Sequence, residues 1–149
     1  MLPGSLPEIF LDTDVAFDIL SKREPHFESS VQFLHLAIQH KARLLISESS
    51  LGNLFYLTFD IYKLKNAASR VFDFINICEL VPSGKIAVLK SLESSFKDKE
   101  DGLQYYTALH RDVDYFITRN IKDYRKHMQA SLPVFSPKEF FDLIHKPKG

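Results

Sequence analysis

The apolar residues of this chain follow two spacings, which alternate along its length. Short runs of consecutive apolar residues are typical of strands buried on both faces, as in a parallel sheet. Five such runs predict strands at residues 8–12, 41–47, 79–82, 115–118 and 132–135. The last run includes Pro133, which has no backbone N–H to donate, so we expect this strand at an edge of the sheet.

Helical spacing, with apolar residues three or four positions apart, fills the segments between these runs. It predicts helices at residues 15–20, 27–38, 51–62, 66–77, 86–94, 102–111 and from 137 onward. In the segment 66–77, the spacing predicts that Ala68, Val71, Phe72 and Ile75 face inward. The segment from Ser136 to Glu139 has the residues of a capping box, with proline in the first turn.

Strands that alternate with helices in this way predict a three-layer α/β/α domain with a mostly parallel sheet of about five strands. The chain has 149 residues, enough for one domain with a substantial core. No repeat, low-complexity tract or linker divides it. We therefore expect residues 1–149 to form a single domain.

Acidic residues stand where these elements begin and end. Asp12 closes the first apolar run, Asp98 and Asp101 precede the helix at 102–111, and Asp123 follows the fourth run. In a parallel sheet, such positions surround the crevice where ligands bind. Carboxylates gathered there repel one another unless a cation neutralises them, and their hard oxygen atoms suit magnesium or manganese. The pattern therefore predicts a metal-dependent enzyme that acts on phosphate.

Composition and charge restrict the partners and the cellular location that we expect for the protein. Lys and Arg together equal Asp and Glu at 19 each, so no overall positive field recruits nucleic acid. The single cysteine, Cys78, fits a reducing compartment. We find no signal-peptide pattern and no apolar run long enough to cross a membrane, so we expect a cytoplasmic protein without a membrane partner.

Three segments in this order, at 9–13, 98–104 and 117–124, resemble the PIN domain, and in particular its bacterial branch of VapC-type toxin ribonucleases. The likeness covers residues 8–144. It is carried by Ile9-Phe10-Leu11-Asp12-Thr13, Asp98-x-Glu100-Asp101-x-Leu103-Gln104 and Ile117-Thr118-Arg119-Asn120-x-x-Asp123-Tyr124. The resemblance implies a small α/β nuclease that cleaves RNA with magnesium or manganese, and it makes an antitoxin protein a candidate partner.

The family's acids carry over by position. Asp12, Asp101 and Asp123 are the expected catalytic residues and metal ligands, with Asp98 as a further possible ligand. Two positions depart from the family pattern, because Asn53 stands where a Glu is usual and Asn120 where an Asp is frequent. An amide carbonyl still binds magnesium or orients its water, but it brings no charge.

Other residues are expected to support this site. Asn53, Asn120, Thr118 and Asp14 are the predicted neighbours of the ligands, able to orient a carboxylate or a metal-bound water. A basic run beside the acids predicts a rim that binds RNA phosphates. Its members are Arg119, Lys122 and Arg125, and Arg119 is the first choice for holding the non-bridging oxygens.

Two other functions remain open at this point. The incomplete acidic set at Asn53 allows a degenerate, non-catalytic module that binds RNA or protein. Asp12 to Val15 also mimics the nucleophile motif of haloacid-dehalogenase-type phosphatases, with Ser47 as the phosphate-binding serine. That family needs a pair of acids after a later strand, whereas Asp112 and Asp114 precede the fourth apolar run.

The aromatic content also predicts self-association. The chain has 13 Phe, and the expected helix at 51–62 carries apolar residues on more than one face, including Phe55, Leu57 and Phe59. One face can pack on the sheet, while the other would be exposed without a partner. We therefore expect a homodimer.

Overall fold

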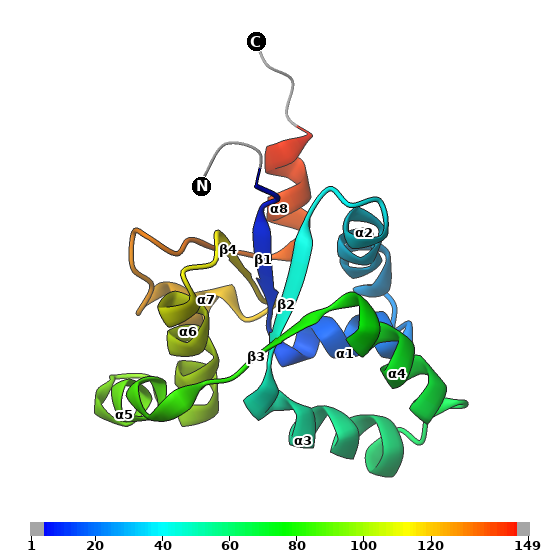
Figure 1. The fold of residues 1–149 in the computed structure, drawn as a ribbon, viewed down its shortest axis with the longest axis horizontal. Coiled ribbons are helices and arrows are strands. Elements are labelled where there is room, and N and C mark those ends of the chain that lie inside the picture. Colours follow the sequence, from blue (N-terminus) through cyan, green and yellow to red (C-terminus); the bar gives the residue numbers. More distant parts are fainter. Residues whose placement is uncertain (1–4, 146–149) are drawn as a thin grey trace.

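Five parallel strands form the centre of the molecule, in the order β3-β2-β1-β4-β5 (Figure 1). The computed structural model of the chain describes residues 5–145. The strands are β1 (Glu8–Leu11), β2 (Arg43–Ser47), β3 (Glu79–Val81), β4 (Tyr115–Ile117) and β5 (Val134–Phe135). The predicted strand positions and the edge position of the strand after Pro133 are confirmed.

Eight α-helices connect and cover these strands within the described residues. They are α1 (Thr13–Ser21), α2 (Phe27–Ile38), α3 (Leu51–Phe55), α4 (Ala67–Ile77), α5 (Gly84–Glu93), α6 (Lys99–Arg111), α7 (Ile121–Arg125) and α8 (Pro137–Ile144). A 3-10 turn, Glu48–Ser50, precedes α3, and a π-helical turn, Tyr56–Ile61, continues it. No helix in the described part of the chain has both the length and the apolar composition to span a membrane.

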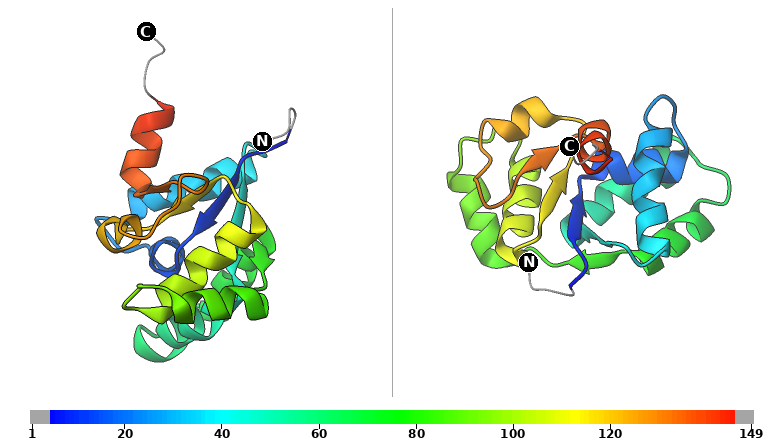
Figure 2. Two further views of the ribbon diagram at one scale, coloured as in Figure 1. Left: turned by 90° about the vertical axis from the view of Figure 1, so that its left-hand side faces the viewer. Right: turned by 90° about the horizontal axis from the view of Figure 1, so that it is seen from above.

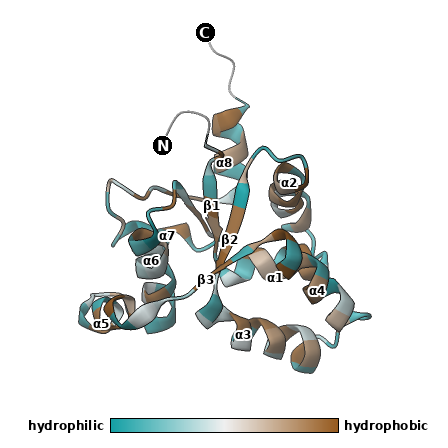
Figure 3. Cartoon of the chain, in the orientation of Figure 1, coloured by the Kyte–Doolittle hydropathy of each residue, from teal (hydrophilic) through white to brown (hydrophobic). Residues whose placement is uncertain are grey.

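Helices cover both faces of the sheet, which confirms the predicted three-layer arrangement (Figure 2). Side chains alternate along β1, because successive residues of a strand point to opposite faces. Ile9 and Leu11 join the core beneath α1, α2, α4 and α8, whereas Phe10 joins the core beneath α6 and α7. In Figure 3 the central strands are coloured as hydrophobic over much of their length, as expected for strands buried on both faces.

The start of α6 differs from the prediction, and the difference matters for the acids. This helix begins at Lys99 rather than at residue 102, because the Asp98 side chain caps it. Asp98 Oδ1 accepts hydrogen bonds from the backbone N–H groups of Glu100 (2.9 Å) and Asp101 (3.2 Å). Asp101 therefore lies in the first helical turn, where its negative charge complements the helix dipole.

Two further expectations need correction. The segment after β4, where the sequence spacing predicts no helix, forms the short helix α7. In α4, the prediction that Ala68 and Phe72 face inward is wrong, since Phe72 is 68% exposed. Ala67, Val71 and Phe74 are the buried residues, so the apolar stripe is displaced by one position around the helix.

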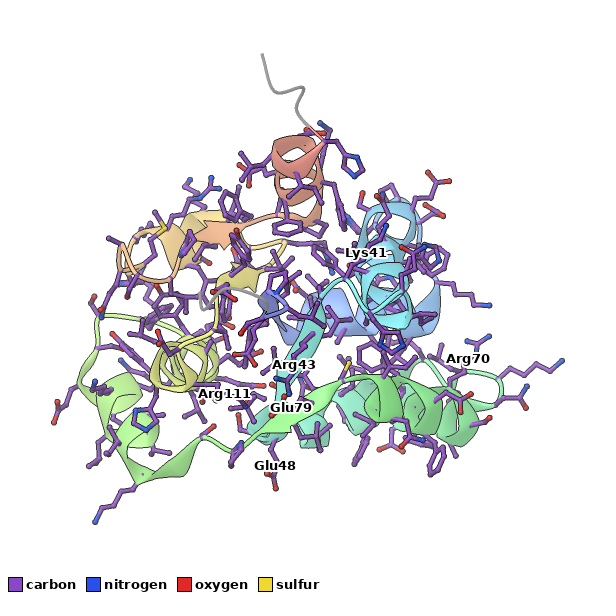
Figure 4. The ribbon with its side chains drawn as sticks, turned by 45° about the horizontal axis from the view of Figure 1, so that its top comes forward. Lys41, Arg43, Glu48, Arg70, Glu79 and Arg111 are labelled. Atoms are coloured by element: carbon purple, nitrogen blue, oxygen red, sulfur yellow. The ribbon has the colours of Figure 1, made fainter. Side chains whose placement is uncertain are left out.

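An ion-pair cluster joins three strands at their amino ends. Arg111, at the last turn of α6, binds Glu79 Oε1 at 2.8 Å and Glu8 Oε2 at 3.1 Å. Arg43 binds Glu79 Oε2 at 2.9 Å (Figure 4). Because Arg111 ends α6 while Asp101 begins it, α6 runs antiparallel to the strands and places its acidic end at their carboxyl edge.

Candidate active site

A hollow of about 280 Å³ lies at the carboxyl end of β1, between α3 and the start of α6. Asp12 follows β1 directly and caps α1. Asp101 reaches the same hollow from the first turn of α6. The lining residues are Asp12, Thr13, Asp14, Asn53, Leu57, Asp98, Glu100, Asp101, Gln104 and Asn120. The structure thus brings together two of the three predicted catalytic acids, both Asn residues and Asp14; we call this the acidic hollow.

Hydrogen bonds hold the Asp12 carboxylate in one orientation. The backbone N–H of Thr13 donates to Oδ1 and the Thr118 hydroxyl donates to Oδ2, each at 2.7 Å. The Thr118 hydroxyl in turn accepts from the backbone N–H of Asn120 at 2.9 Å. Asp12 is only 5% exposed, so little besides these donors and a bound cation can stabilise its charge.

Gln104 is a member of this site to which the sequence alone gave no role. Its side-chain carbonyl accepts from the backbone N–H and the hydroxyl of Thr13, both at 3.2 Å, and so ties α6 to α1. Its spacing could have indicated this role, since a residue three positions after Asp101 lies on the same face of the helix. Gln104 is buried and fixes the separation between the two helices that carry Asp12 and Asp101.

The two principal acids resist ionisation in the absence of a counter-charge. Burial, and then the neighbouring Asp14 charge, raise the pKa of Asp12 to about 7. Burial, and then the charges of Asp12 and Asp98, raise the pKa of Asp101 to about 7. The pKa of Asp14 is also raised, first by burial. Perturbed acids that gather in a hollow mark a functional site.

The chemistry of these donors fits a divalent cation. Carboxylate and amide oxygens are the ligands of hard cations, and a cation would offset both the burial and the repulsion that raise the two pKa values. Within residues 5–145, no group of three or more His, Cys, Asp or Glu side chains is already gathered tightly enough to hold a metal ion by itself. An ion bound here would therefore rely on two carboxylates supplemented by neutral oxygen ligands such as amides and water.

Asp123 lies apart from Asp12, so the expected convergence of three acids is incomplete. It is exposed and lines an adjoining hollow with Asp98 and Asp101. Its Oδ2 accepts a 2.9 Å hydrogen bond from the Asn120 side chain. The physical reason is α7: the helix starts directly after Asn120 and turns Asp123 to the outer side of the segment. Asn120 therefore links Asp123 to the acidic hollow.

The predicted phosphate rim is also arranged differently. Arg119, Lys122 and Arg125 do not line the acidic hollow. Arg119 Nε lies 2.6 Å from Oδ2 of Asp18, a fully buried carboxylate of α1. Burial raises the pKa of Asp18, and the Arg119 charge opposes this rise. Arg119 thus neutralises a buried acid, which the sequence did not reveal because the two residues are far apart along the chain.

Arg125 and Lys122 occupy two different environments. Arg125 donates to both carboxylate oxygens of Glu139 at 2.9 Å and to the Val134 carbonyl at 3.1 Å. It therefore fastens α7 to β5 and α8. Lys122 is exposed on α7, so its charge remains accessible to a ligand.

Tyr124 is a second residue that the sequence left without a role. Its side chain is fully buried against Phe96, Tyr105 and Phe116. Burial raises the pKa of the Asp101 carboxyl, and the nearby Tyr124 hydroxyl opposes part of this rise. Tyr124 therefore forms the inner wall behind Asp101.

Comparison with known proteins identifies the family to which the chain belongs. The family model of the PIN domain matches residues 8–122. Ribonuclease VapC1 of Aquifex aeolicus (strain VF5) is 35% identical over 106 residues, which cover 68% of this chain and 73% of that protein.

Solved structures share the fold at low sequence identity. The DNA-bound VapBC from Salmonella typhimurium has a TM-score of 0.67 and 16% identity, covering 89% of this chain and 99% of that chain. The toxin-antitoxin complex from Klebsiella pneumoniae has a TM-score of 0.64 and 18% identity, covering 87% and 97%. VapC20 of Mycobacterium tuberculosis, a Sarcin-Ricin loop cleaving toxin, has a TM-score of 0.62 and 8% identity, covering 81% and 96%. On the strength of the family model and the VapC1 relative, this chain belongs to the PIN domain family.

Proposed function

We propose that this protein is a divalent-metal-dependent endoribonuclease that hydrolyses phosphodiester bonds of RNA and acts as the toxin of a toxin–antitoxin pair. The observation that carries the proposal is the buried Asp12 carboxyl and the partly buried Asp101 carboxyl, which reach one hollow from different elements. The relationship to Ribonuclease VapC1 supports RNA as the substrate. Complexes of toxin with antitoxin among the structural neighbours support an antitoxin partner.

Each residue of the site has a task in this proposal. Asp12 and Asp101 would hold the ion, with Asp98 and Asp123 beside them and the amides of Asn53 and Asn120 completing the oxygen environment. A bound magnesium or manganese ion would supply a nucleophilic hydroxide near neutral pH and stabilise charge on the phosphate.

The remaining residues of the site prepare the two carboxylates. Thr118 and the Thr13 N–H keep Asp12 oriented, and Gln104 keeps α6 in place behind Asp101. With amides at positions 53 and 120, the site carries less charge than a fully acidic one. Magnesium should therefore bind weakly, and manganese, which binds such ligands more tightly, should support higher activity.

The decisive experiment is a cleavage assay with single-stranded RNA, titrated separately with magnesium and manganese. Wild type should cleave at metal concentrations well above trace levels, and Asp101→Asn should lose cleavage because a charge that holds the ion is removed. Glu93→Gln, an exposed acid at the end of α5, is a matched control that should retain activity. Equal inactivity of wild type and Asp101→Asn at every metal concentration would favour the non-catalytic binding module.

The phosphatase alternative loses its support. The chain belongs to the PIN domain family, and Thr118-Arg119-Asn120 follows β4 where that alternative requires two acids. The Ser47 hydroxyl, its expected phosphate ligand, caps the following turn by accepting a 3.2 Å hydrogen bond from the Ser49 backbone N–H, and it lies 2.6 Å from the Ser49 hydroxyl.

A second copy of the chain is the proposed occupant of the aromatic surface on the α3 side. Six large apolar side chains are exposed there, on α3, on the π-helical turn and its end, and on α4. They are Phe55, Tyr56, Phe59, Ile61, Tyr62 and Phe72. Light scattering at micromolar concentration should report a homodimer, and Phe59→Asp should shift it to a monomer. A wild-type monomer at that concentration would contradict the proposal.

A further inference from the structure

A second hollow, of about 230 Å³, adjoins the acidic hollow and shares Asp98 and Asp101 with it. We call it the His127 hollow. Its lining residues are Ser95, Phe96, Lys97, Asp98, Asp101, Asp123, Lys126 and His127. Because two carboxyls form a common wall, a ligand that extends from the acidic hollow in this direction enters the His127 hollow next.

The His127 ring is held in place on one side by an aromatic floor. Its centroid lies 4.2 Å from that of Phe96, with the ring planes 33° apart. Phe96 is itself buried, at 3% exposure, and packs against Tyr105 and Tyr124. The Ser95 hydroxyl lies 2.8 Å from His127 Nδ1 and prevents the ring from rotating freely. An imidazole fixed in this way is a flat, preorganised surface.

Two lysines stand at the same hollow. Lys97 and Lys126 are both exposed, and neither takes part in an ion pair within residues 5–145. Lysine ammonium groups bind phosphate oxygens as point charges. The hollow thus combines a fixed aromatic ring with two lysines, a combination that proteins use to bind single-stranded nucleic acid. Its three carboxylates, Asp98, Asp101 and Asp123, are those expected at the metal site.

We propose that the His127 hollow binds the nucleotide next to the scissile phosphodiester bond, with its base stacked on His127 and its phosphates near Lys97 and Lys126. This inference rests on the proposed ribonuclease function and specifies one position of the RNA. Stacking on an aromatic ring tolerates every base, so the subsite holds a nucleotide without selecting its identity. It therefore positions the chain for cleavage at Asp12 and Asp101.

The test compares protein and RNA changes at the same contact. The probe is a fluorescent single-stranded RNA of defined sequence, together with a series in which one base at a time is removed to leave an abasic nucleotide. Binding is measured by fluorescence anisotropy in EDTA, and cleavage is measured separately with manganese. For wild type, removing the base at one position should weaken binding by roughly tenfold, and where the RNA is cut this position should adjoin the cleaved bond.

The His127→Ala variant should bind the intact RNA roughly tenfold more weakly, and removing the same base should then cause no further loss. His127→Phe preserves a flat ring on Phe96 and should keep most of the wild-type effect. His110→Ala changes an exposed histidine on α6 and is the matched control, for which the full abasic effect is expected.

The outcomes separate this inference from the proposed function. An RNA that binds but is not cut with manganese defeats the ribonuclease proposal, while the binding series still tests the subsite. Equal abasic effects in wild type and His127→Ala would overturn the subsite, even if the substitution weakens binding overall. Failure of wild type to bind the RNA at all would overturn it as well.

Discussion

The Thr118 hydroxyl, at the end of β4, donates a 2.7 Å hydrogen bond to Oδ2 of Asp12 at the end of β1. The same hydroxyl accepts from the backbone N–H of Asn120 at 2.9 Å. One small side chain therefore orients the first acid of the site and the segment that carries Asn120. Both strands are paired in parallel, so the contact is a product of the sheet's register.

Replacing Thr118 by valine keeps the shape and removes the hydroxyl. Asp12 Oδ2 and the Asn120 N–H would both lose a buried partner, at a cost in unfolding free energy on the order of 1–3 kcal/mol. Because Asp12 also loses its orientation, kcat/KM should fall roughly 10- to 100-fold. Thr58→Val removes a buried hydroxyl that, among residues 5–145, donates only to the carbonyls of Leu54 and Phe55, so the activity of this variant should stay near wild type. Equal losses in the two variants would contradict the role of Thr118.

The raised acid pKa values predict an unusual pH dependence of stability without metal. Asp12 and Asp101 have pKa values of about 7 in the folded chain, whereas the ordinary pKa of an aspartate is 3.8. Between these values the folded state binds more protons than the unfolded state, so unfolding free energy falls as pH rises through this window.

Melting temperatures in EDTA should therefore decrease from pH 5 to pH 8, and manganese should raise them most at pH 8, where the carboxyls are ionised. Asp12→Asn should flatten the pH profile because one titrating group is removed. A metal-free stability that increases over this range would be inconsistent with the two raised pKa values.

Asn53 offers a direct test of how charge limits the metal site. It is exposed and lines the acidic hollow, so Asn53→Glu adds a carboxylate without removing a buried contact. Manganese affinity, measured by calorimetry, should increase by roughly tenfold, equivalent to about 1.4 kcal/mol. Asn76→Glu places the same charge on an exposed position of α4 and should leave manganese affinity unchanged. No difference between the two variants would show that position 53 does not contribute to the metal site.

Alanine substitutions of Arg119 and of Arg125 should differ in how much stability they cost. Arg119→Ala leaves the buried Asp18 charge without its partner, which should cost on the order of 3–5 kcal/mol. Arg125→Ala breaks a partly exposed pair with Glu139 and should cost about 1 kcal/mol or less. Urea unfolding of both variants measures the difference. If Arg119→Ala is as stable as wild type but binds RNA more weakly, the rim predicted from the sequence is the better account of Arg119.

Replacing Gly102 and Gly52 by alanine should change the stability of the protein in opposite directions. A Cβ at Gly102 would lie 2.7 Å from the Ser91 hydroxyl and 3.3 Å from Phe96, so α6 would have to move away from its neighbours. We expect Gly102→Ala to lose about 1–3 kcal/mol of stability and to lower activity, because Asp101 is the preceding residue.

Gly52, within α3, has open space around its Cβ position, so Gly52→Ala should stabilise the protein by about 0.5–1 kcal/mol. Thermal melts of both variants test the pair. A Gly102→Ala variant with wild-type melting temperature and activity would show that α6 tolerates the displacement.

The strands and the positions of Asp12 and Asp101 could be predicted because they depend on local order along the chain. A carboxylate directly after a parallel strand lies at the carboxyl edge of the sheet, and so does one in the first turn of a helix that runs back antiparallel to the strands. Contacts between distant residues could not be predicted in this way. Arg119 reads as a free cation next to the acids, and only the folded chain reveals that Asp18 is its partner.

The sequence also did not reveal small differences in which residues of a helix face the core. The displacement by one residue that exposes Phe72, and the start of α7 that turns Asp123 outward, both depend on where a helix begins. Sequence spacing sets the period of a helix, but tertiary packing chooses which residues of that period are buried. The role of Gln104 was missed for a related reason, because it depends on a hydrogen bond to Thr13 of α1 that only the folded chain reveals.

Because α6 runs antiparallel to the strands, its two ends lie at opposite edges of the sheet, and the protein can be attached by one edge while the other stays free. Its Arg111 end is anchored at the amino edge of the sheet, where Lys41 is exposed just before β2, while its Asp101 end lies at the opposite edge (Figure 4). A fluorophore or surface linker attached at position 41 would therefore report on the protein, or immobilise it, with the acidic hollow facing away from the attachment. Single molecules tethered in this orientation would present the same edge of the sheet to RNA in solution.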